Sequence, residues 1–154
     1  MNPDSFVSPE LIELFNKAAS LARNGEYSES VKTFDEVINA KNPDGKPYIV
    51  SGRFSGITHL RKSWALMDLE KYSEAKEMLE NKNMKIFLGQ FEPKDLYDYY
   101  FSYANILGNL GEVEKMKESF NKAIEIAEDM NNKELFDQAT KLMAAQVIKY
   151  HLQK

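Results

Sequence analysis

Histidine is the side chain in this sequence best suited to acid–base catalysis or metal binding, and it occurs only twice, at His59 and His151. The two residues fall in different expected helices, and neither stands in an HxxxH or HxxE arrangement that would direct two ligands at one metal ion. Cysteine is absent, so disulfides and thiolate ligands are excluded. No nucleophile has a visible partner base. The sequence therefore predicts no catalytic residue, no metal and no cofactor, and hence no enzyme.

Two short segments each contain only part of a known functional motif. Residues 52–56 read GRFSG, but a nucleophile elbow needs serine at its centre, where Phe54 stands. The segment GKP at 45–47 lacks the preceding glycine and the following hydroxyl residue of a phosphate-binding loop. The acidic residues between 112 and 129 are interleaved with lysines, which indicates a solvated helix face rather than a general acid–base pair.

The charge balance argues against a nucleic-acid partner. The chain has 20 basic and 24 acidic residues, a net charge of −4, whereas nucleic-acid binders concentrate basic side chains where phosphates bind. The local basic excess at Arg53, Arg61 and Lys62 is interpreted as a solvated helix face. No apolar run approaches the ~20 residues that span a bilayer, and the first residues lack the basic and apolar regions of a signal peptide. We therefore expect a cytoplasmic protein without membrane insertion.

Hydrophobic spacing predicts helices along the whole chain. A chain of 154 residues with 43% hydrophobic content suits one all-α domain, and no strand pattern stands out. Two stretches are less regular. Residues 46–56 suit either an ordered loop or an early helix start, and residues 81–90 are expected to form an irregular connector that places apolar side chains on the core. The expected helices begin near residues 9, 27, 55, 72, 93, 112 and 133.

Three segments, each a turn followed by a helix, repeat one pattern. They read GEYSESVKTFDEVI from Gly25, EKYSEAKEMLENKN from Glu70 and GEVEKMKESFNKAI from Gly111. The pattern resembles the tetratricopeptide repeat family, whose unit is a helix–turn–helix of about 34 residues. The sequence departs from that family where Glu70 replaces the turn glycine, and the turn residues lie further apart than one family unit. Each segment places a bulky apolar residue nine positions after its turn residue, at Phe34, Leu79 and Phe120.

The resemblance implies a fold with defined boundaries. Hairpins of this family stack because no unit can bury its apolar face alone, and the stack forms a right-handed α-solenoid. In this chain it implies a single TPR-like helical domain over residues 1–154. Its three hairpins would span about 9–44, 53–89 and 93–130, followed by a capping helix at about 133–152.

The resemblance also implies a binding surface, because the first helices of the units line the concave face of such a solenoid. For Trp64 and Phe101, packing between repeats is the competing interpretation, since apolar residues at helical spacing are more often core. A lysine and asparagine clamp for a terminal carboxylate is not expected, because only Asn105 suits one. The residues expected in this partner-binding groove are Phe15, Ala19, Leu60, Trp64, Met67, Phe101 and Asn105.

The sequence thus favours a non-catalytic module that binds another protein or a peptide segment, as an adaptor, chaperone or inhibitor. A different class is left open, namely a sensor that binds a small molecule or a short signalling peptide in the same groove. Self-association into a homodimer, through the tyrosine-rich helix near residue 100 or the last helix, is also left open. The pattern of residues does not identify the partner.

Overall fold

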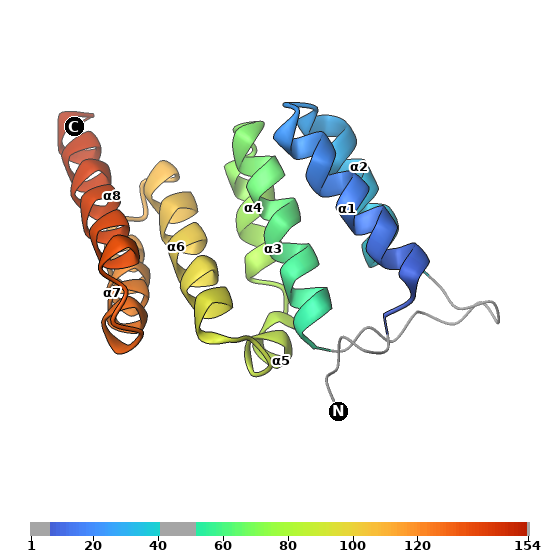
Figure 1. Ribbon diagram of the computed structural model, residues 1–154. Coiled ribbons are helices and arrows are strands. Elements are labelled where there is room, and N and C mark those ends of the chain that lie inside the picture. The colour runs from blue at the N-terminus through green and yellow to red at the C-terminus, as the bar shows by residue number, and fades with distance from the viewer. Residues whose placement is uncertain (1–6, 41–51, 154) are drawn as a thin grey trace. The chain divides into compact units, whose positions relative to one another are not determined.

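A computed structural model describes residues 7–40 and 52–153, and these residues form eight helices with no strand among them (Figure 1). The prediction of an all-α helical repeat is confirmed. The helices are α1 (Pro9–Arg23), α2 (Tyr27–Ile38), α3 (Arg53–Asp68), α4 (Tyr72–Leu79), α5 (Met84–Leu88), α6 (Pro93–Asn109), α7 (Val113–Asp129) and α8 (Lys133–Leu152).

The helices belong to two compact units, which we describe separately. Unit 1 ends at Phe91 and contains α1 to α5, and unit 2 begins at Glu92 and contains α6 to α8. In unit 1, α1 and α2 form one hairpin, α3 and α4 form another, and α2 packs on α3. In unit 2, α6 and α7 form the third hairpin, and α8 packs on α7 and less extensively on α6. The three predicted hairpins are therefore present, while the handedness of a stack of all three stays a prediction.

Side chains that the sequence places at helix starts account for where α1 and α8 begin. Ser8 is the N-cap of α1, and its Oγ accepts a hydrogen bond of 3.2 Å from the backbone N–H of Leu11. Pro9 occupies the first helical position, where its missing N–H costs nothing. At α8, Oδ1 of Asn132 accepts from the backbone N–H of Leu135 at 3.1 Å. Each cap satisfies a donor that the helix itself cannot pair.

The turns of the three hairpins share one backbone conformation. Gly25, Glu70 and Gly111 have φ values of +81°, +59° and +78°. The glutamate thus adopts the left-handed conformation that the two glycines adopt, although its Cβ makes that conformation less favourable. The residues nine positions later confirm the register of the repeat, because each is at most 1% exposed: Phe34, Leu79 and Phe120.

We expect Glu70→Gly to raise the free energy of unfolding by about 0.5 kcal/mol, because removal of Cβ strain outweighs the added freedom of the unfolded chain. The matched variant Gly111→Ala should lower it by about 1 kcal/mol. A Cβ at Gly111 would meet no atom within 4 Å, so backbone strain alone would be measured there. Urea unfolding followed by circular dichroism checks both values. A loss of stability in Glu70→Gly would contradict the strain argument.

The structure differs from two expectations about the segments that connect the hairpins. The helix expected from about Ser55 begins at Arg53, after Gly52 with φ +104°, and Gly56 lies inside it. Residues 81–90 are not wholly irregular, because they contain the short helix α5. Met84 packs on the core as expected, at 2% exposed, whereas Ile86 points to solvent at 61% exposed.

Some sequence expectations lie outside the described residues. They are the part of the loop-or-helix alternative that falls on residues 46–51, the end of the first expected hairpin at 41–44, and the first six residues and the last residue of the expected domain.

Candidate functional site

Two of the groove residues predicted in unit 1 take part in packing. Leu60 is 2% exposed and lies in the core, so its prediction as a contact residue is wrong, because a buried side chain cannot reach a partner. Phe15 is half-buried, and its ring packs edge-on against Phe34 of α2 at a centroid distance of 5.5 Å. The same ring lies 5.4 Å from that of Phe54 in α3. Phe15 therefore joins three helices of unit 1.

The other three groove residues predicted in unit 1 are half-buried: Ala19 on α1, and Trp64 and Met67 on α3. The guanidinium group of Arg61 lies 4.6 Å from the centre of the Trp64 ring, a cation–π arrangement on the same helix. Trp64 thus has one face against an exposed cation. Its role as a contact residue stays a prediction.

In unit 2, the predicted groove residue Phe101 belongs to an aromatic cluster. Its ring stacks on Tyr97 at 5.6 Å, and it meets the ring of Phe120 edge-on at 6.0 Å. Tyr97 and Phe120 are both at most 1% exposed. Packing within the third hairpin accounts for Phe101, which is itself half-buried.

Asn105, the remaining predicted residue, lies in a polar line of contacts between α6 and α8. Gln146 donates through Nε2 to Oδ1 of Asn105 at 2.7 Å. One turn further along both helices, the ammonium group of Lys149 donates to Oδ1 of Asn109 at 3.1 Å. Successive contacts join later residues of both helices, so α6 and α8 run in parallel. We call these four residues the α6–α8 seam.

The hydrogen bonds of Asn105 show which of its groups the seam offers to a ligand. Asn109 donates through Nδ2 to the carbonyl oxygen of Asn105 at 2.8 Å, and the Oδ1 atom of Asn105 accepts from Gln146. The Nδ2 group of Asn105 donates to none of the described residues, and Asn105 is half-buried rather than enclosed. Neighbouring amides therefore hold Asn105 in place while its two N–H donors remain for a carbonyl or carboxylate oxygen.

Gln146 was missed at the sequence level, although its position is unusual. It is 7% exposed, and its Oε1 accepts no hydrogen bond from the described residues. A Cβ at Gly108 would lie 2.8 Å from Cδ of Gln146 and 2.9 Å from Sδ of Met116. Glycine at 108 therefore leaves the room that lets Gln146 cross to Asn105. One signal in the sequence could have found it. Gln146 lies seven residues after Ala139, so both residues fall on the same side of α8, the side that is buried.

Tyr97 fixes the other end of the contact between α6 and α8. Its hydroxyl lies 2.8 Å from the carbonyl oxygen of Leu135 and 3.0 Å from Oε1 of Gln138. Burial disfavours the phenolate, and the negative charge of Asp98 opposes it further, which together raise the pKa of Tyr97 to about 12. Tyr97 is therefore a neutral anchor over the physiological pH range.

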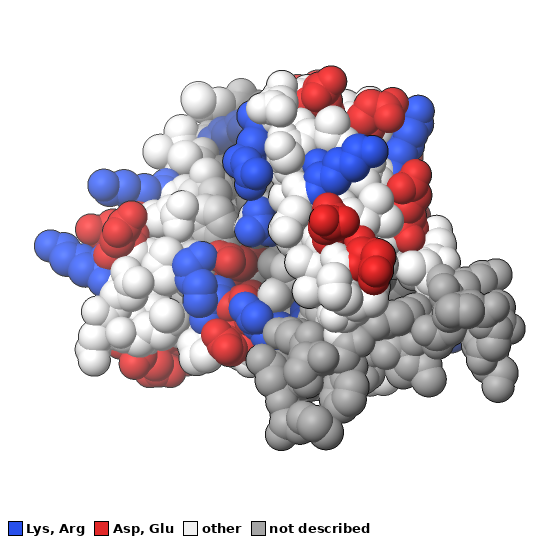
Figure 2. Space-filling model, turned by 45° about the vertical axis from the view of Figure 1, so that its right-hand side comes forward, with Lys and Arg blue, Asp and Glu red and all other residues white. Residues whose placement is uncertain are grey.

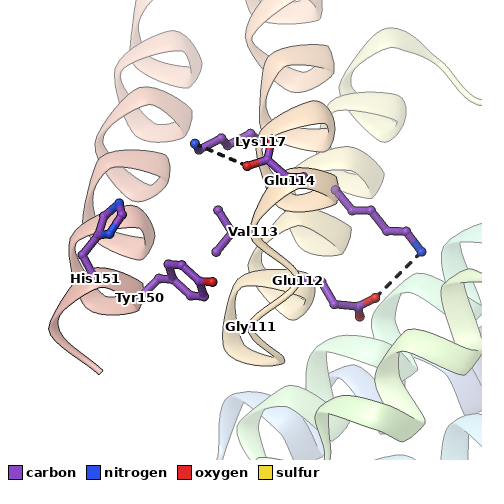
Figure 3. A pocket seen from close by; sticks show the side chains of 8 residues that line it. Gly111, Glu112, Val113, Glu114, Lys117, Tyr150 and His151 are labelled. Carbon is purple, nitrogen blue, oxygen red and sulfur yellow. Dashed lines mark ion pairs between the residues drawn. The ribbon is translucent and has the colours of Figure 1, made fainter. Parts of the chain in front are cut away.

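A pocket of about 520 Å³ lies between the start of α7 and the end of α8 (Figure 3). Tyr150 extends from α8 toward Val113 at the first turn of α7. The charged residues that line the pocket form ion pairs along α7: Lys115 with Glu112 at 3.8 Å and Lys117 with Glu114 at 3.9 Å. Because the two lysines and the two glutamates compensate one another, these four residues give the pocket no net charge that would select an ionic ligand.

His59 is a packing residue in unit 1. Its Nδ1 lies 2.7 Å from the carbonyl oxygen of Ser55, and its ring lies 5.4 Å from that of Phe87. Burial lowers the pKa of His59, the hydrogen bond to Ser55 opposes this, and the charge of Lys62 lowers it further. His151 belongs to unit 2 and is exposed. In the described ranges, no cluster of three or more histidine or acidic side chains could hold a metal ion.

Charged side chains of both signs are interspersed on the face of the molecule shown in Figure 2. On α6, Lys94 and Asp98 form an ion pair with 2.7 Å between Nζ and Oδ1. Interspersed charges of this kind fit the solvated faces expected from the sequence. Across the described residues, no helix is long and apolar enough to cross a bilayer.

Residues 97–130 match the sequence model of the tetratricopeptide repeat family. The matched stretch covers most of α6, the turn at Gly111 and all of α7, which is the third predicted hairpin. No similar curated protein and no similar solved structure was found for the chain.

Proposed function

Since the chain is a TPR-like helical repeat protein, with a tetratricopeptide repeat at residues 97–130, we propose that it is a non-catalytic module that binds an extended segment of another protein along the α6–α8 seam. Repeats of this kind typically serve as protein-interaction modules, and their stacked helices offer extended surfaces rather than reactive groups. The observation that carries the proposal is the Nδ2 group of half-buried Asn105, which donates to none of the described residues although the side chain is held in place on a helix of the matched repeat.

The chemistry of the seam suits a peptide main chain. Asn105 offers two N–H donors, and Lys149 has N–H donors beyond the one that it gives to Asn109. Residues four apart on a helix are separated by about 6 Å along its axis. Carbonyl groups on one side of an extended peptide recur at about 6.8 Å, so two successive ones can accept from successive turns of the seam.

Preorganisation supports the same conclusion. The side-chain amide of Asn105 is already oriented through its Oδ1 atom, which accepts from Nε2 of Gln146 on α8 at 2.7 Å and from Nδ2 of Asn109 on its own helix at 3.3 Å. A ligand that accepts from Nδ2 therefore binds without having to immobilise that side chain, which reduces the entropic cost of association.

The test is selection of random extended peptides on the intact protein, followed by affinity measurements on the Asn105→Ala variant. A net hydrogen bond contributes about 0.5–1.5 kcal/mol, so we expect the selected peptides to bind Asn105→Ala roughly 3–10-fold more weakly. The matched control is Asn121→Ala, the same change at an exposed position of α7, which should leave affinity unchanged. Thermal unfolding of both variants shows that the fold is intact.

Peptides that bind wild type and Asn105→Ala equally well would remove the seam as the site. If no peptide is selected while a low-mass compound binds and is lost in Asn105→Ala, the small-molecule sensor replaces this proposal.

A further inference from the structure

The side-chain amides of the α6–α8 seam are linked in one direction, because two of their partners can act in only one way. The ammonium group of Lys149 only donates hydrogen bonds, and it donates to Oδ1 of Asn109. A backbone carbonyl oxygen only accepts, and that of Asn105 accepts from Nδ2 of Asn109 at 2.8 Å. Both partners therefore require the same orientation of the Asn109 amide, with its nitrogen toward Asn105.

The orientation of Asn109 determines that of the next amide. Nδ2 of Asn109 also lies 3.3 Å from the side-chain oxygen of Asn105, and turning the Asn105 amide over would place N–H donors against each other. With Oδ1 of Asn105 in that position, the atom of Gln146 that lies 2.7 Å from it has to be a donor, which is its Nε2. The group that remains is Nδ2 of Asn105, which donates to none of the described residues.

The cost of this arrangement falls on Gln146. It is 7% exposed, and its Oε1 accepts no hydrogen bond from the described residues, which is unfavourable for a buried acceptor. Turning over Gln146 and Asn105 together would give that oxygen a donor. It would also set the nitrogen of Asn105 against that of Asn109 and enclose the N–H groups of Gln146 instead. The unpaired Oε1 is therefore what we expect if Asn109 determines the direction.

We propose that Asn109 is a positioning residue that sets the hydrogen-bond polarity of the seam. Through it, Asn105 presents donors, so the seam selects segments that place a carboxylate or carbonyl oxygen there and rejects segments that place an ammonium group there. The inference deepens the function proposed for the seam and rests on it for the ligand. The charge of Lys149 adds attraction for a carboxylate. The polarity does not require that charge, because the carbonyl oxygen of Asn105 by itself holds the amide of Asn109.

The first test needs no ligand. Neutron diffraction from deuterated crystals of the intact protein shows which atom of the Asn105 amide carries deuterium. We expect deuterium on the atom turned away from Gln146, and on the atom of Gln146 nearest to Asn105. In Asn109→Asp, where the new carboxylate only accepts, the Asn105 amide should turn over. Deuterium on the Asn105 atom that faces Asn109 in the wild type would overturn the proposal.

The second test measures binding of two libraries of extended peptides that differ only in a central glutamate or a central lysine. In 1 M sodium chloride the screening length is about 3 Å, so long-range attraction to Lys149 contributes little. We expect the wild type to prefer the glutamate peptides on the order of tenfold, and Asn109→Asp to prefer the lysine peptides. The charge-matched control is Lys149→Ala, which lowers the net charge by the same amount and should keep the preference for glutamate.

Equal preference for glutamate in the wild type and Asn109→Asp would overturn the proposal, since a purely structural role of Asn109 predicts that result. Thermal unfolding shows whether each variant keeps its fold. If neither library binds the wild type, the function proposed for the seam is overturned, and the selection of ligands with it. The neutron result on the wild type decides the polarity separately, so the two failures can be told apart.

Discussion

Replacing Phe120 with alanine should lower the free energy of unfolding by about 3–5 kcal/mol, a large part of the ~5–15 kcal/mol that stabilises a typical protein. Phe120 is fully buried in the core of unit 2, where its ring meets that of Phe101 edge-on. Alanine would leave a cavity beneath α6 and remove this aromatic contact. Because Asn105 lies one turn beyond Phe101 on the same helix, we also expect binding at the seam to be lost. Chemical denaturation gives the stability change directly.

The control for this prediction is Phe136→Ala. Phe136 packs against the same core but is only partly buried, so the same chemical change should cost clearly less. Equal losses in the two variants would mean that burial within the matched repeat does not determine its stability.

Gly56→Ala should destabilise the protein by about 1–3 kcal/mol, although alanine favours helices more than glycine by about 1 kcal/mol. Gly56 lies inside α3, where an added Cβ would overlap the ring of Phe91 and approach Cβ of Phe87 to 2.9 Å. Phe91 is 9% exposed, so its ring has little room to move. The segment that follows α5 therefore packs directly on the backbone of α3, and only glycine permits that distance. A lower midpoint of thermal unfolding is the expected readout.

Gly89→Ala provides the comparison for this effect. Gly89 is exposed, its φ is −64°, and an added Cβ would meet only the carbonyl oxygen of Ile86 at an ordinary 3.5 Å. We expect that variant to be as stable as the wild type or slightly more stable. If Gly56→Ala behaved in the same way, the close packing of Phe91 on α3 would be refuted.

The hairpins could be predicted from the sequence because their signals are local. Helical spacing of apolar residues, Ser8-Pro9 at a helix start and glycine at a turn act through neighbours in the chain. The equivalence of Glu70 with Gly25 and Gly111 was also readable, since the apolar residue nine positions later fixes the register whatever the turn residue is. The match of residues 97–130 to the tetratricopeptide repeat agrees with that reading.

Accessibility was harder to predict, because it depends on which helix lies opposite. Leu60 has the spacing of a groove residue, yet neighbouring helices bury it. Ile148 and Leu152 on α8 were not among the predicted contact residues, yet they are 60% and 81% exposed. Spacing identifies the residues that share a face of a helix, but it does not say whether a partner covers that face.

The sequence by itself determined the helices of the three hairpins and the terminal helix, though not α5, together with their pairing and the repeat register, because each follows from interactions within about 34 residues. Only the tertiary structure decided that Gln146 reaches Asn105, since those two residues are 41 positions apart in the chain. Their contact requires α8 to lie parallel to α6, with room at Gly108 for the side chain to cross. The seam is therefore a product of packing between helices, which no local pattern of residues records.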